Sequence, residues 1–409
     1  MSTVTKPHRL AVSPHRRRRA ELLASPPPVV ILGGGTNALS IARSLGRRGA
    51  AVWAINFANE AVCRSRYARR VPLADGPDPA AVWTEFLLSR RSDHLRGAVL
   101  LAACDDGLKI IAENRAALDE KFLLDDSNPE AQLCMLDKLS TYRAATAAGV
   151  PTPRFWTAES MADLEAARDE LVYPLIVKPR LSHLFERRFG AKFVVVRSFD
   201  ELLAAFQNVH DADISVMLVE QIPGPDDRLC SYYTYLDEWG NPLFHFTKRI
   251  VRRYPVGMGA ACYHVTDAIP ELHELGLRLF RHVGLRGLAN VEFKRDERDG
   301  RLKLIECNAR FTAANCLVER AGYDLARLVY NRIVGLPQPR LTGFRTGLRL
   351  WYPIEDFHAF RQMRRQGMLS FPRWLASLLH RQTLPYFSWR DPMPTIVGQL
   401  RRLRRKLKR

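Results

Sequence analysis

Residues 29 to 125 alternate short apolar runs with amphipathic segments, a pattern typical of a doubly wound α/β domain. Each apolar run is short enough for a buried parallel strand, and each amphipathic segment fits a covering helix. The runs that predict strands are Val29–Leu32, Ala51–Asn56 and Val99–Ala103. We therefore expect this region to fold as a small parallel sheet with helices on its faces.

The first strand-to-helix turn of this region consists of Gly33, Gly34 and Gly35. A glycine-rich turn at this point indicates either a nicotinamide site or a turn that closes tightly. Asn56 stands where the ribose-binding acid of a nicotinamide site is expected, so the tight turn is favoured. Asp105, which follows the third strand, is interpreted as part of a helix cap rather than as a ligand.

Strand and helix patterns continue to about residue 340. A helix over 129–149 carries Lys138, and an apolar strand over 173–179 ends in Lys178. An apolar run over 216–224 completes a small α+β unit, and a second α+β unit follows it. The expected boundaries are 1–28 for a basic leader, 29–125 for the α/β domain, 126–340 for the second domain (subdomains about 151–224 and 229–336), and 341–409 for an extension.

The stretch from Val291 to Arg310 predicts a β-hairpin, because apolar residues flank a polar turn that contains Gly300. A three-residue loop over 298–300 would place Glu292 opposite Glu306. Period-two alternation then puts Glu306, Asn308 and Arg310 on one face, and it turns Cys307 toward the core. Paired carboxylates and an amide favour Mg²⁺ or Mn²⁺. The alternative is a hairpin whose polar face meets only water.

Charge is distributed unevenly along the 409 residues, whose net charge is +19. Residues 341 to 409 contain 15 Lys/Arg and 3 Asp/Glu, a balance of +12, and residues 1 to 28 contain 6 and 1, a balance of +5. The central body is therefore near neutral. Arg16–Arg19 are followed by Pro26–Pro28 rather than by the apolar region of a signal peptide, so we expect a disordered basic leader.

Seven cysteines without a Cys-x-x-Cys pair favour reduced thiols in the cytoplasm over disulfides or a zinc site. The sequence contains no apolar run of about 18 residues, so we expect no transmembrane helix.

The segment from residue 341 onward interleaves aromatic residues with arginine and finishes with a basic run over 401–409. This pattern is typical of an element that lies on an anionic membrane surface, here at the inner face of the membrane. Nucleic-acid binding is not expected, because no recognised nucleic-acid fold accompanies the charge. The remaining alternative is that the aromatic residues pack back onto the body and the tail is merely solvated.

The ordered set of motifs resembles the ATP-grasp superfamily, in particular the carboxylate–amine ligase branch that contains the D-aspartate ligases. The resemblance covers about residues 29 to 336 and includes a pre-ATP-grasp α/β domain, a lid subdomain and a metal-carboxylate subdomain. It rests on Asp137-Lys138, Val177-Lys178-Pro179, Val219-Glu220 to Gly224, Glu292, and Glu306-Cys307-Asn308-Ala309-Arg310. The implied architecture is an ATP-grasp fold followed by a basic, aromatic C-terminal extension.

The resemblance implies a nucleotide site. Lys138 and Lys178 match the two lysines that neutralise ATP phosphates. The hinge that meets the adenine edge matches Glu220, Gln221 and Ile222, and Asp227 is a weaker match for a residue that contacts the ribose. In one departure, the loop over 181–190 is bulky and basic and keeps only Gly190, which puts a backbone cradle for phosphate in doubt.

The resemblance also implies the catalytic groups. Glu292, Glu306 and Asn308 match ligands of Mg²⁺ (or Mn²⁺) that bridge the β- and γ-phosphates. Arg310 stands where related ligases hold an acyl phosphate or a substrate carboxylate. We further expect either Arg249 or Arg252 to face the site and to stabilise the transferring phosphoryl group.

The implied function is an ATP-dependent, ADP-forming ligase that joins a small-molecule carboxylate to an amine through an acyl phosphate. An amino acid joined to a cell-envelope precursor is the expected type of product. A non-catalytic ATP-binding regulatory protein is the alternative, and the intact set of Glu292, Glu306 and Asn308 argues against it.

Overall fold

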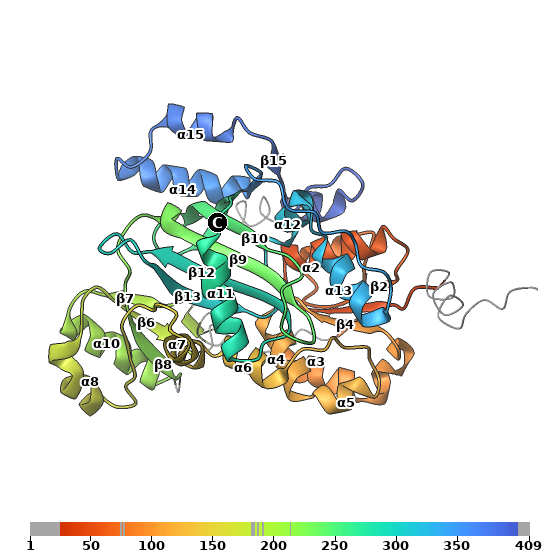
Figure 1. Ribbon diagram of the computed structural model, residues 1–409, viewed down its shortest axis with the longest axis horizontal. Helices are drawn as coiled ribbons and strands as arrows, with labels where there is room; N and C mark the ends of the chain where they lie inside the picture. The colour runs from red at the N-terminus through yellow and green to blue at the C-terminus, as the bar shows by residue number, and fades with distance from the viewer. Residues whose placement is uncertain are drawn as a thin grey trace, which may run out of the picture.

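The computed structural model describes residues 25–399, apart from 74, 75, 77, 181–184, 186, 187, 190, 191 and 213. The expectations about the leader up to residue 24, most of the 181–190 loop, and the basic end over 401–409 lie outside the described residues. Within them the chain forms three sheets, and Figure 1 shows these sheets as three neighbouring bodies.

The first sheet is parallel, with the strand order β3-β2-β1-β4. Its strands are β1 (Val29–Leu32), β2 (Val52–Ile55), β3 (Arg69–Arg70) and β4 (Val99–Ala102). All four side chains of β1 are buried, because the strand is central and covered on both faces. The helices of this region are α2 (Thr36–Gly46), α3 (Pro79–Leu88), α4 (Asp105–Glu113) and α5 (Arg115–Asp119).

The glycine-rich turn after β1 is packed too tightly for larger residues. A Cβ atom on Gly33, where φ is +64°, would lie 2.2 Å from Cys104 Sγ. A Cβ atom on Gly34, where φ is +80°, would lie 2.5 Å from the carbonyl oxygen of Ala103. Glycine is therefore required at these two positions because the turn packs closely against the end of β4.

The second sheet is antiparallel, with the order β5-β8-β6-β7. Its elements are β5 (Phe155–Trp156), α8 (Met161–Ala167), β6 (Leu175–Pro179), β7 (Val194–Val196), α10 (Phe199–His210) and β8 (Val216–Glu220). Two helices, α6 (Pro129–Leu136) and α7 (Lys138–Ala147), precede the sheet in the chain. The single helix expected over 129–149 is wrong, because Asp137 is extended and caps α7 by accepting hydrogen bonds from the backbone nitrogens of Leu139 and Ser140.

The third sheet has the order β13-β12-β9-β10-β11-β14-β15. Its body strands are β9 (Leu229–Leu236), β10 (Phe246–Tyr254), β11 (Ala260–Thr266), β12 (Gly287–Arg295) and β13 (Leu302–Asn308). Helix α11 (Glu271–His282) packs on this sheet through Leu272, Leu279 and Phe280, which join Tyr232 and Val291 in one core. Two further helices, α12 (Asn315–Ala321) and α13 (Leu325–Val334), pack with α2 in another core.

The predicted hairpin forms as β12 and β13, and Glu292 lies directly opposite Glu306. The expected three-residue loop is wrong, because Arg295 pairs with Leu302 and the connection is longer. A bulge compensates for the extra loop length. Since Phe293 pairs with Leu304 and Glu292 pairs with Glu306, Ile305 has no opposite residue and the predicted pairing of the glutamates is restored.

The segment after residue 340 extends the third sheet. Strand β14 (Arg349–Trp351) pairs with β11, and β15 (Gln382–Thr383) pairs with β14. Helices α14 (Pro353–Arg365) and α15 (Phe371–Leu378) lie between these two strands in the chain. A boundary at residue 340 therefore does not coincide with an edge of the sheet. No helix of the described residues is both long and apolar enough to cross a membrane.

Candidate active site

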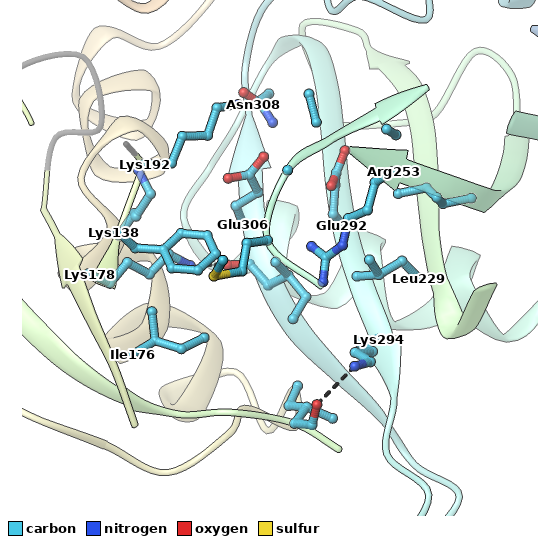
Figure 2. Close-up of a pocket in the computed structure, with 18 of the residues that line it drawn as sticks. Lys138, Ile176, Lys178, Lys192, Leu229, Arg253, Glu292, Lys294, Glu306 and Asn308 are labelled. Carbon is cyan, nitrogen blue, oxygen red and sulfur yellow. Dashed lines mark hydrogen bonds between the residues drawn. The ribbon is translucent and has the colours of Figure 1, made fainter. Parts of the chain in front are cut away.

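A cavity of about 330 Å³ lies between the second and third sheets. It is bordered by α7 and β6 on one side, by the chain after β8, and by the face of the third sheet. Figure 2 shows the carboxylates of Glu292 and Glu306 in this space, with Lys138, Lys178 and Lys192 to one side. The cavity thus brings together residues that are far apart in the sequence.

Nine of the residues predicted for the site border this cavity. They are Lys138, Lys178, Glu220, Gln221, Ile222, Glu292, Glu306, Asn308 and Arg310. The other three predicted residues, Asp227, Arg249 and Arg252, do not border it.

The two glutamates share an environment that separates their pKa values. Burial and the neighbouring charge of Glu306 raise the pKa of Glu292. Burial also opposes the ionisation of Glu306, but the ammonium groups of Lys138 and Lys178 lower the pKa of that carboxyl. Among the described residues, no hydrogen bond or ion pair involves either carboxylate. Both groups therefore retain free oxygen atoms toward the cavity.

Lys178 is placed by the strand and by its hydrogen bonds. Its side chain is 8% exposed, and its Nζ donates to the carbonyl oxygen of Ile305 at 2.7 Å and to Tyr142 Oη at 3.4 Å. Burial, followed by the charge of Lys138, lowers the pKa of Lys178 to about 7. An anion that entered beside Lys178 would gain from its positive charge and would favour the protonated form.

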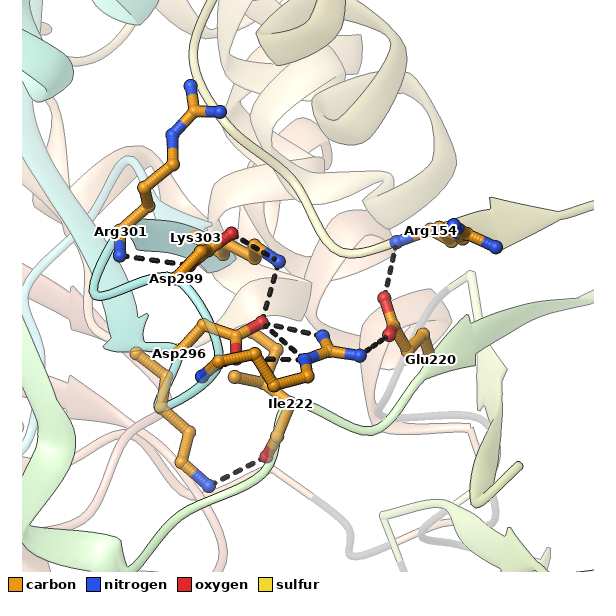
Figure 3. A network of polar contacts seen from close by, with 9 residues as sticks. Arg154, Glu220, Ile222, Asp296, Asp299, Arg301 and Lys303 are labelled. Carbon is orange, nitrogen blue, oxygen red and sulfur yellow. Dashed lines mark hydrogen bonds and ion pairs between the residues drawn. The ribbon is translucent and has the colours of Figure 1, made fainter. Parts of the chain in front are cut away.

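A network of polar contacts fixes the chain at the end of β8 (Figure 3). Arg298 lies between two carboxylates, because it donates both to Glu220 and to the fully buried Asp296. Lys303 also pairs with Asp296, and Glu220 accepts a hydrogen bond from the backbone nitrogen of Arg154. Arg298 therefore connects the hairpin loop to the segment that was predicted to meet adenine.

Lys294 supports the same segment from the face of the sheet. Its Nζ donates to the carbonyl oxygens of Ile222 and Gly224, at 2.9 and 2.6 Å. Apolar side chains complete this part of the cavity, namely Ile176, Val219, Ile222, Leu229 and Ile250. A largely apolar lining with backbone polar groups beside it suits an adenine ring.

The expectation that Arg249 or Arg252 faces the site is wrong. Arg249 pairs with Asp267 on the far side of the strand, and Arg252 is buried against Asp356. The register of β10 against β11 shifts between Ile250 and Arg252. This bulge changes the phase of the alternation, so simple period-two counting fails along the strand.

Lys248 and Arg253 border the cavity in place of those two arginines. Lys248 is 2% exposed, and its Nζ donates to Ser231 Oγ at 3.0 Å. Burial lowers its pKa, whereas the charge of Glu292 acts in the opposite direction. Lys248 and Ile250 are two residues apart on one strand, so alternation places their side chains on the same side. This spacing is the sequence signal that could have identified Lys248 as a cavity residue.

The ribose contact expected from Asp227 is also not supported, because its side chain is exposed and outside the cavity lining. The preceding residue, Asp226, has a structural role. It accepts from Arg253 Nε at 2.6 Å and from the backbone nitrogen of Gly257 at 2.9 Å. Asp226 thereby holds Arg253 and the turn after β10 at the rim of the cavity.

Arg310 connects the cavity to the first sheet. Its Nε donates to Asp105 Oδ1 at 2.5 Å, and Asp105 is the first residue of α4. The expectation that Asp105 belongs to a helix cap is wrong, since the Cys104 side chain caps α4 by accepting from the backbone nitrogen of Gly107. The salt bridge therefore holds Arg310 at the meeting point of the α/β domain and the hairpin.

The balance of charge in the cavity is positive. Its cationic residues are Lys138, Lys178, Lys192, Lys248, Arg253, Lys294 and Arg310, and its carboxylates are Glu220, Glu292 and Glu306. Glu220 is already neutralised by Arg298. Such a surplus of cations around a carboxylate pair fits a polyphosphate.

The donor set of the hairpin also fits a hard divalent cation. No group of three or more His, Cys, Asp or Glu side chains gathers in the described part of the chain, so a metal cage made only by such side chains is absent there. Glu292, Glu306 and Asn308 instead offer two carboxylates and an amide. Mg²⁺ accepts few protein ligands of this kind and keeps water or phosphate oxygens in its other positions.

Comparisons with known proteins agree with this geometry. Residues 264–336 match the family described as the carbamoyl-phosphate synthase L chain, ATP binding domain. The chain is 26% identical over 298 residues to the D-aspartate ligase of Enterococcus faecium (strain Aus0004), covering 67% of this chain and 69% of that one. It is 30% identical over 194 residues to the D-alanine–D-alanine ligase of Ectopseudomonas mendocina (strain ymp), covering 44% of this chain and 56% of that enzyme.

A solved structure shows the same fold at low sequence identity. The ADP complex of an N5-carboxyaminoimidazole ribonucleotide synthetase superposes with a TM-score of 0.60 and 14% identity, over 78% of this chain and 80% of that one. The predicted ATP-grasp fold is thereby confirmed. With the shared fold, the family match and the sequence matches to the two ligases support the predicted assignment to the carboxylate–amine ligases of the ATP-grasp superfamily.

Proposed function

We propose that the protein joins an amino acid to an amine of a second small molecule, with ATP as the activating substrate. A carboxylate oxygen attacks the γ-phosphorus of ATP and ADP leaves, which gives an acyl phosphate. The amine then attacks the acyl carbon, phosphate leaves, and the nitrogen loses a proton to form the amide. The observation that carries the proposal is the pair of free carboxylates, Glu292 and Glu306, in a cavity rich in lysine.

The residues of the cavity have separate roles in this proposal. Lys138 and Lys178 neutralise phosphate oxygens of ATP, and Lys294 holds the backbone around Ile222 for adenine. Arg310 binds the acyl phosphate or the substrate carboxylate, because it borders the cavity and is oriented by Asp105. Lys248 and Arg253 occupy the position that was expected of Arg249 and Arg252, where they can stabilise the charge of the transferring phosphoryl group.

Glu292, Glu306 and Asn308 would hold Mg²⁺ (or Mn²⁺) with the nucleotide. When bound, the ion supplies positive charge to the β- and γ-phosphates. The like charges of two facing carboxylates are unfavourable without a cation. The free oxygens and the raised pKa of Glu292 support this assignment.

We further propose that the acceptor is a cell-envelope precursor and that the reaction takes place in the cytoplasm. The sequence matches to a D-aspartate ligase and to a D-alanine–D-alanine ligase support an amino acid substrate. All seven cysteines are free thiols, which supports a reducing compartment.

The experiment that tests the function is ADP release with Mg²⁺, ATP and a panel of D- and L-amino acids, each alone and with envelope-precursor amines. The proposal expects at least one acid to stimulate ADP release, and an amine to convert the activated acid into an amide of matching mass. A protein that binds ATP with no stimulated release across the panel, and no amide by mass spectrometry, would instead be a nucleotide-binding regulator.

A further inference from the structure

Helices α14 and α15 form a projecting pair at one edge of the molecule (Figure 1). The inner side of α14 is buried through Asp356, Ala359 and Phe360. Helix α15 has no fully buried residue and is held by Trp374, whose ring stacks on Phe360 with centroids 4.6 Å apart, and by Ser377 and Leu378, whose carbonyl oxygens accept from Tyr263 Oη and Gln382 Nε2. Trp374 Nε1 also donates to Asp356 Oδ2 at 3.0 Å. The attachment orients α15 and leaves its other side uncovered.

The uncovered side of α15 is apolar. Phe371 and Leu375 are 48% and 45% exposed and lie four residues apart on one side of the helix, and Leu379, which directly follows the helix, is 78% exposed. Phe357 of α14 is 45% exposed and contacts the edge of Trp374. We call these four residues the α14–α15 apolar stripe. A group of large exposed side chains on two neighbouring short helices marks an interaction surface.

Exposed arginines accompany the stripe. Arg361, Arg364 and Arg365 follow Phe357 by four, seven and eight residues, so they share the outward face of α14. Within the described residues none of the three has an ion pair or a hydrogen bond with an acidic group. Two of the three acidic residues after position 340 are buried elsewhere, Asp356 against Arg252 and Asp391 against Arg43. The positive charge of this face is therefore not neutralised by the protein.

We propose that the α14–α15 face docks the enzyme on an anionic lipid surface. The apolar stripe would enter the boundary between headgroups and acyl chains, and the arginines would meet anionic headgroups. A second copy of the chain fits poorly, because a two-fold contact through this face would set the same arginines against each other. Nucleic-acid binding would not explain the exposed Leu375 and Leu379, since aliphatic side chains neither stack on bases nor bind phosphate.

The test uses the full chain with vesicles of phosphatidylcholine alone or mixed with phosphatidylglycerol. One variant carries Arg361→Gln, Arg364→Gln and Arg365→Gln, and its control carries Arg281→Gln, Arg286→Gln and Arg301→Gln, which are exposed arginines on other elements. Each arginine near an anionic surface contributes about fivefold to the affinity, so the first variant should bind mixed vesicles about 100-fold more weakly. The control should bind within about twofold of the parent protein.

The apolar part is tested separately with Leu375→Ser plus Leu379→Ser. Salt screens the arginines but not the stripe, so this variant should lose the binding that the parent protein keeps at high salt. Trp239→Ser is the matched control, because Trp239 is 78% exposed in a turn of the third sheet. Circular dichroism and amino-acid-stimulated ADP release should be unchanged in all of these variants, so a failure of docking is distinct from a failure of the proposed reaction.

Several results would overturn the proposal. Equal loss of vesicle binding in the two arginine variants would mean that only overall charge matters. Unchanged vesicle binding in both α14–α15 variants would place any lipid contact elsewhere. Loss of binding to a single-stranded RNA probe in the first arginine variant, with vesicle binding intact, would assign the face to nucleic acid.

Discussion

Glu292 lies directly opposite Glu306 on neighbouring antiparallel strands, and both carboxylates face a cavity bordered by Lys138 and Lys178. Facing carboxylates destabilise a strand pair, so the arrangement has a cost in the folded state. That cost is offset when cations lie on both sides of the pair. The lysines supply part of that charge, and a divalent ion bound with ATP would supply the rest.

Glu306→Gln should therefore abolish turnover without unfolding the protein. We expect kcat to fall by about 100-fold or more, because one of the groups proposed to hold the divalent ion is lost. The free energy of unfolding should stay within about 1 kcal/mol, since a repulsive charge is removed from the hairpin. Phosphate release and urea unfolding measure the two effects. Glu274→Gln, on the exposed side of α11, is the control, and a Glu306→Gln enzyme with parental kcat would remove the hairpin from the reaction.

ATP affinity should depend on Lys178 and not on the glycine turn of the first sheet. Lys178→Met removes a buried charge from the proposed phosphate position and should weaken ATP binding by about 30-fold or more. Gly35→Ala is the comparison, because a Cβ atom there would lie 3.7 Å from its nearest neighbour, Glu60 Oε2, and has room. Calorimetric titration with ATP decides between the two sites. A folded Gly35→Ala protein that loses ATP while Lys178→Met retains it would move the nucleotide to the α/β domain.

Arg298 should affect the nucleotide through the position of the hinge. Arg298→Ala leaves Glu220 with only the backbone nitrogen of Arg154 and leaves Asp296 with Lys303. We expect KM for ATP to rise by about 10-fold with kcat little changed, because the adenine segment loses one support while the phosphate groups keep theirs. Arg301→Ala is the control, since its exposed side chain lies in the same turn. A fall in kcat with constant KM would instead place Arg298 in the chemical step.

The Arg252–Asp356 pair should contribute to stability and not to turnover. Arg252 is 4% exposed and Asp356 is fully buried, and their shortest contact is 2.6 Å. Arg252→Gln leaves Asp356 as a buried, partly unpaired charge and should cost about 3 kcal/mol of unfolding free energy. Arg249→Gln on the same strand loses a half-exposed pair and should cost no more than about 1 kcal/mol. Equal losses in the two variants would show that the C-terminal segment is not anchored through Arg252.

Acid should weaken the network around Asp296. Hydrogen bonds from Arg298 and Lys303 hold the pKa of Asp296 well below its usual value, so its stabilising contribution is present above about pH 3.9 and is lost as pH falls through the folded-state pKa. Asp296→Asn should therefore be less stable than the parent protein at pH 7, and the gap should narrow toward pH 3. Urea unfolding at both pH values measures the gap, and a gap of constant size would contradict the assignment.

The hairpin shows how far the sequence predicts this site. The facing pair of Glu292 and Glu306 was predicted correctly although both the loop length and the absence of a bulge were wrong, because the two errors cancel. A signal for the bulge is present in the sequence. The core residues Leu302 and Leu304 occupy even-numbered positions, whereas the core residues Cys307 and Ala309 occupy odd-numbered positions. The change from even to odd core positions requires one unpaired residue between Leu304 and Cys307.

Other features depend on contacts that no local pattern contains. Arg253 borders the cavity in place of Arg252 because of a bulge in β10 that no change in the sequence pattern indicates, whereas Lys248 precedes the bulge and lies on the same side of the strand as Ile250. Asp356 meets Arg252 across 104 residues of chain, and Asp391 meets Arg43 across 348. Long-range pairs of this kind join the C-terminal segment to the body. The sequence left packing onto the body open as an alternative for this basic, aromatic segment, but it did not indicate which residues make the attachment.

The most direct test of the proposed reaction follows the oxygen atoms of the substrate carboxylate. The amino acid that best stimulates ADP release is labelled with ¹⁸O in its carboxylate and incubated with ATP, Mg²⁺ and the acceptor amine. An acyl phosphate requires one labelled oxygen to leave with each phosphate, so the account predicts one ¹⁸O in the phosphate for every ADP formed. Phosphate without label, formed in step with the amide, would contradict it.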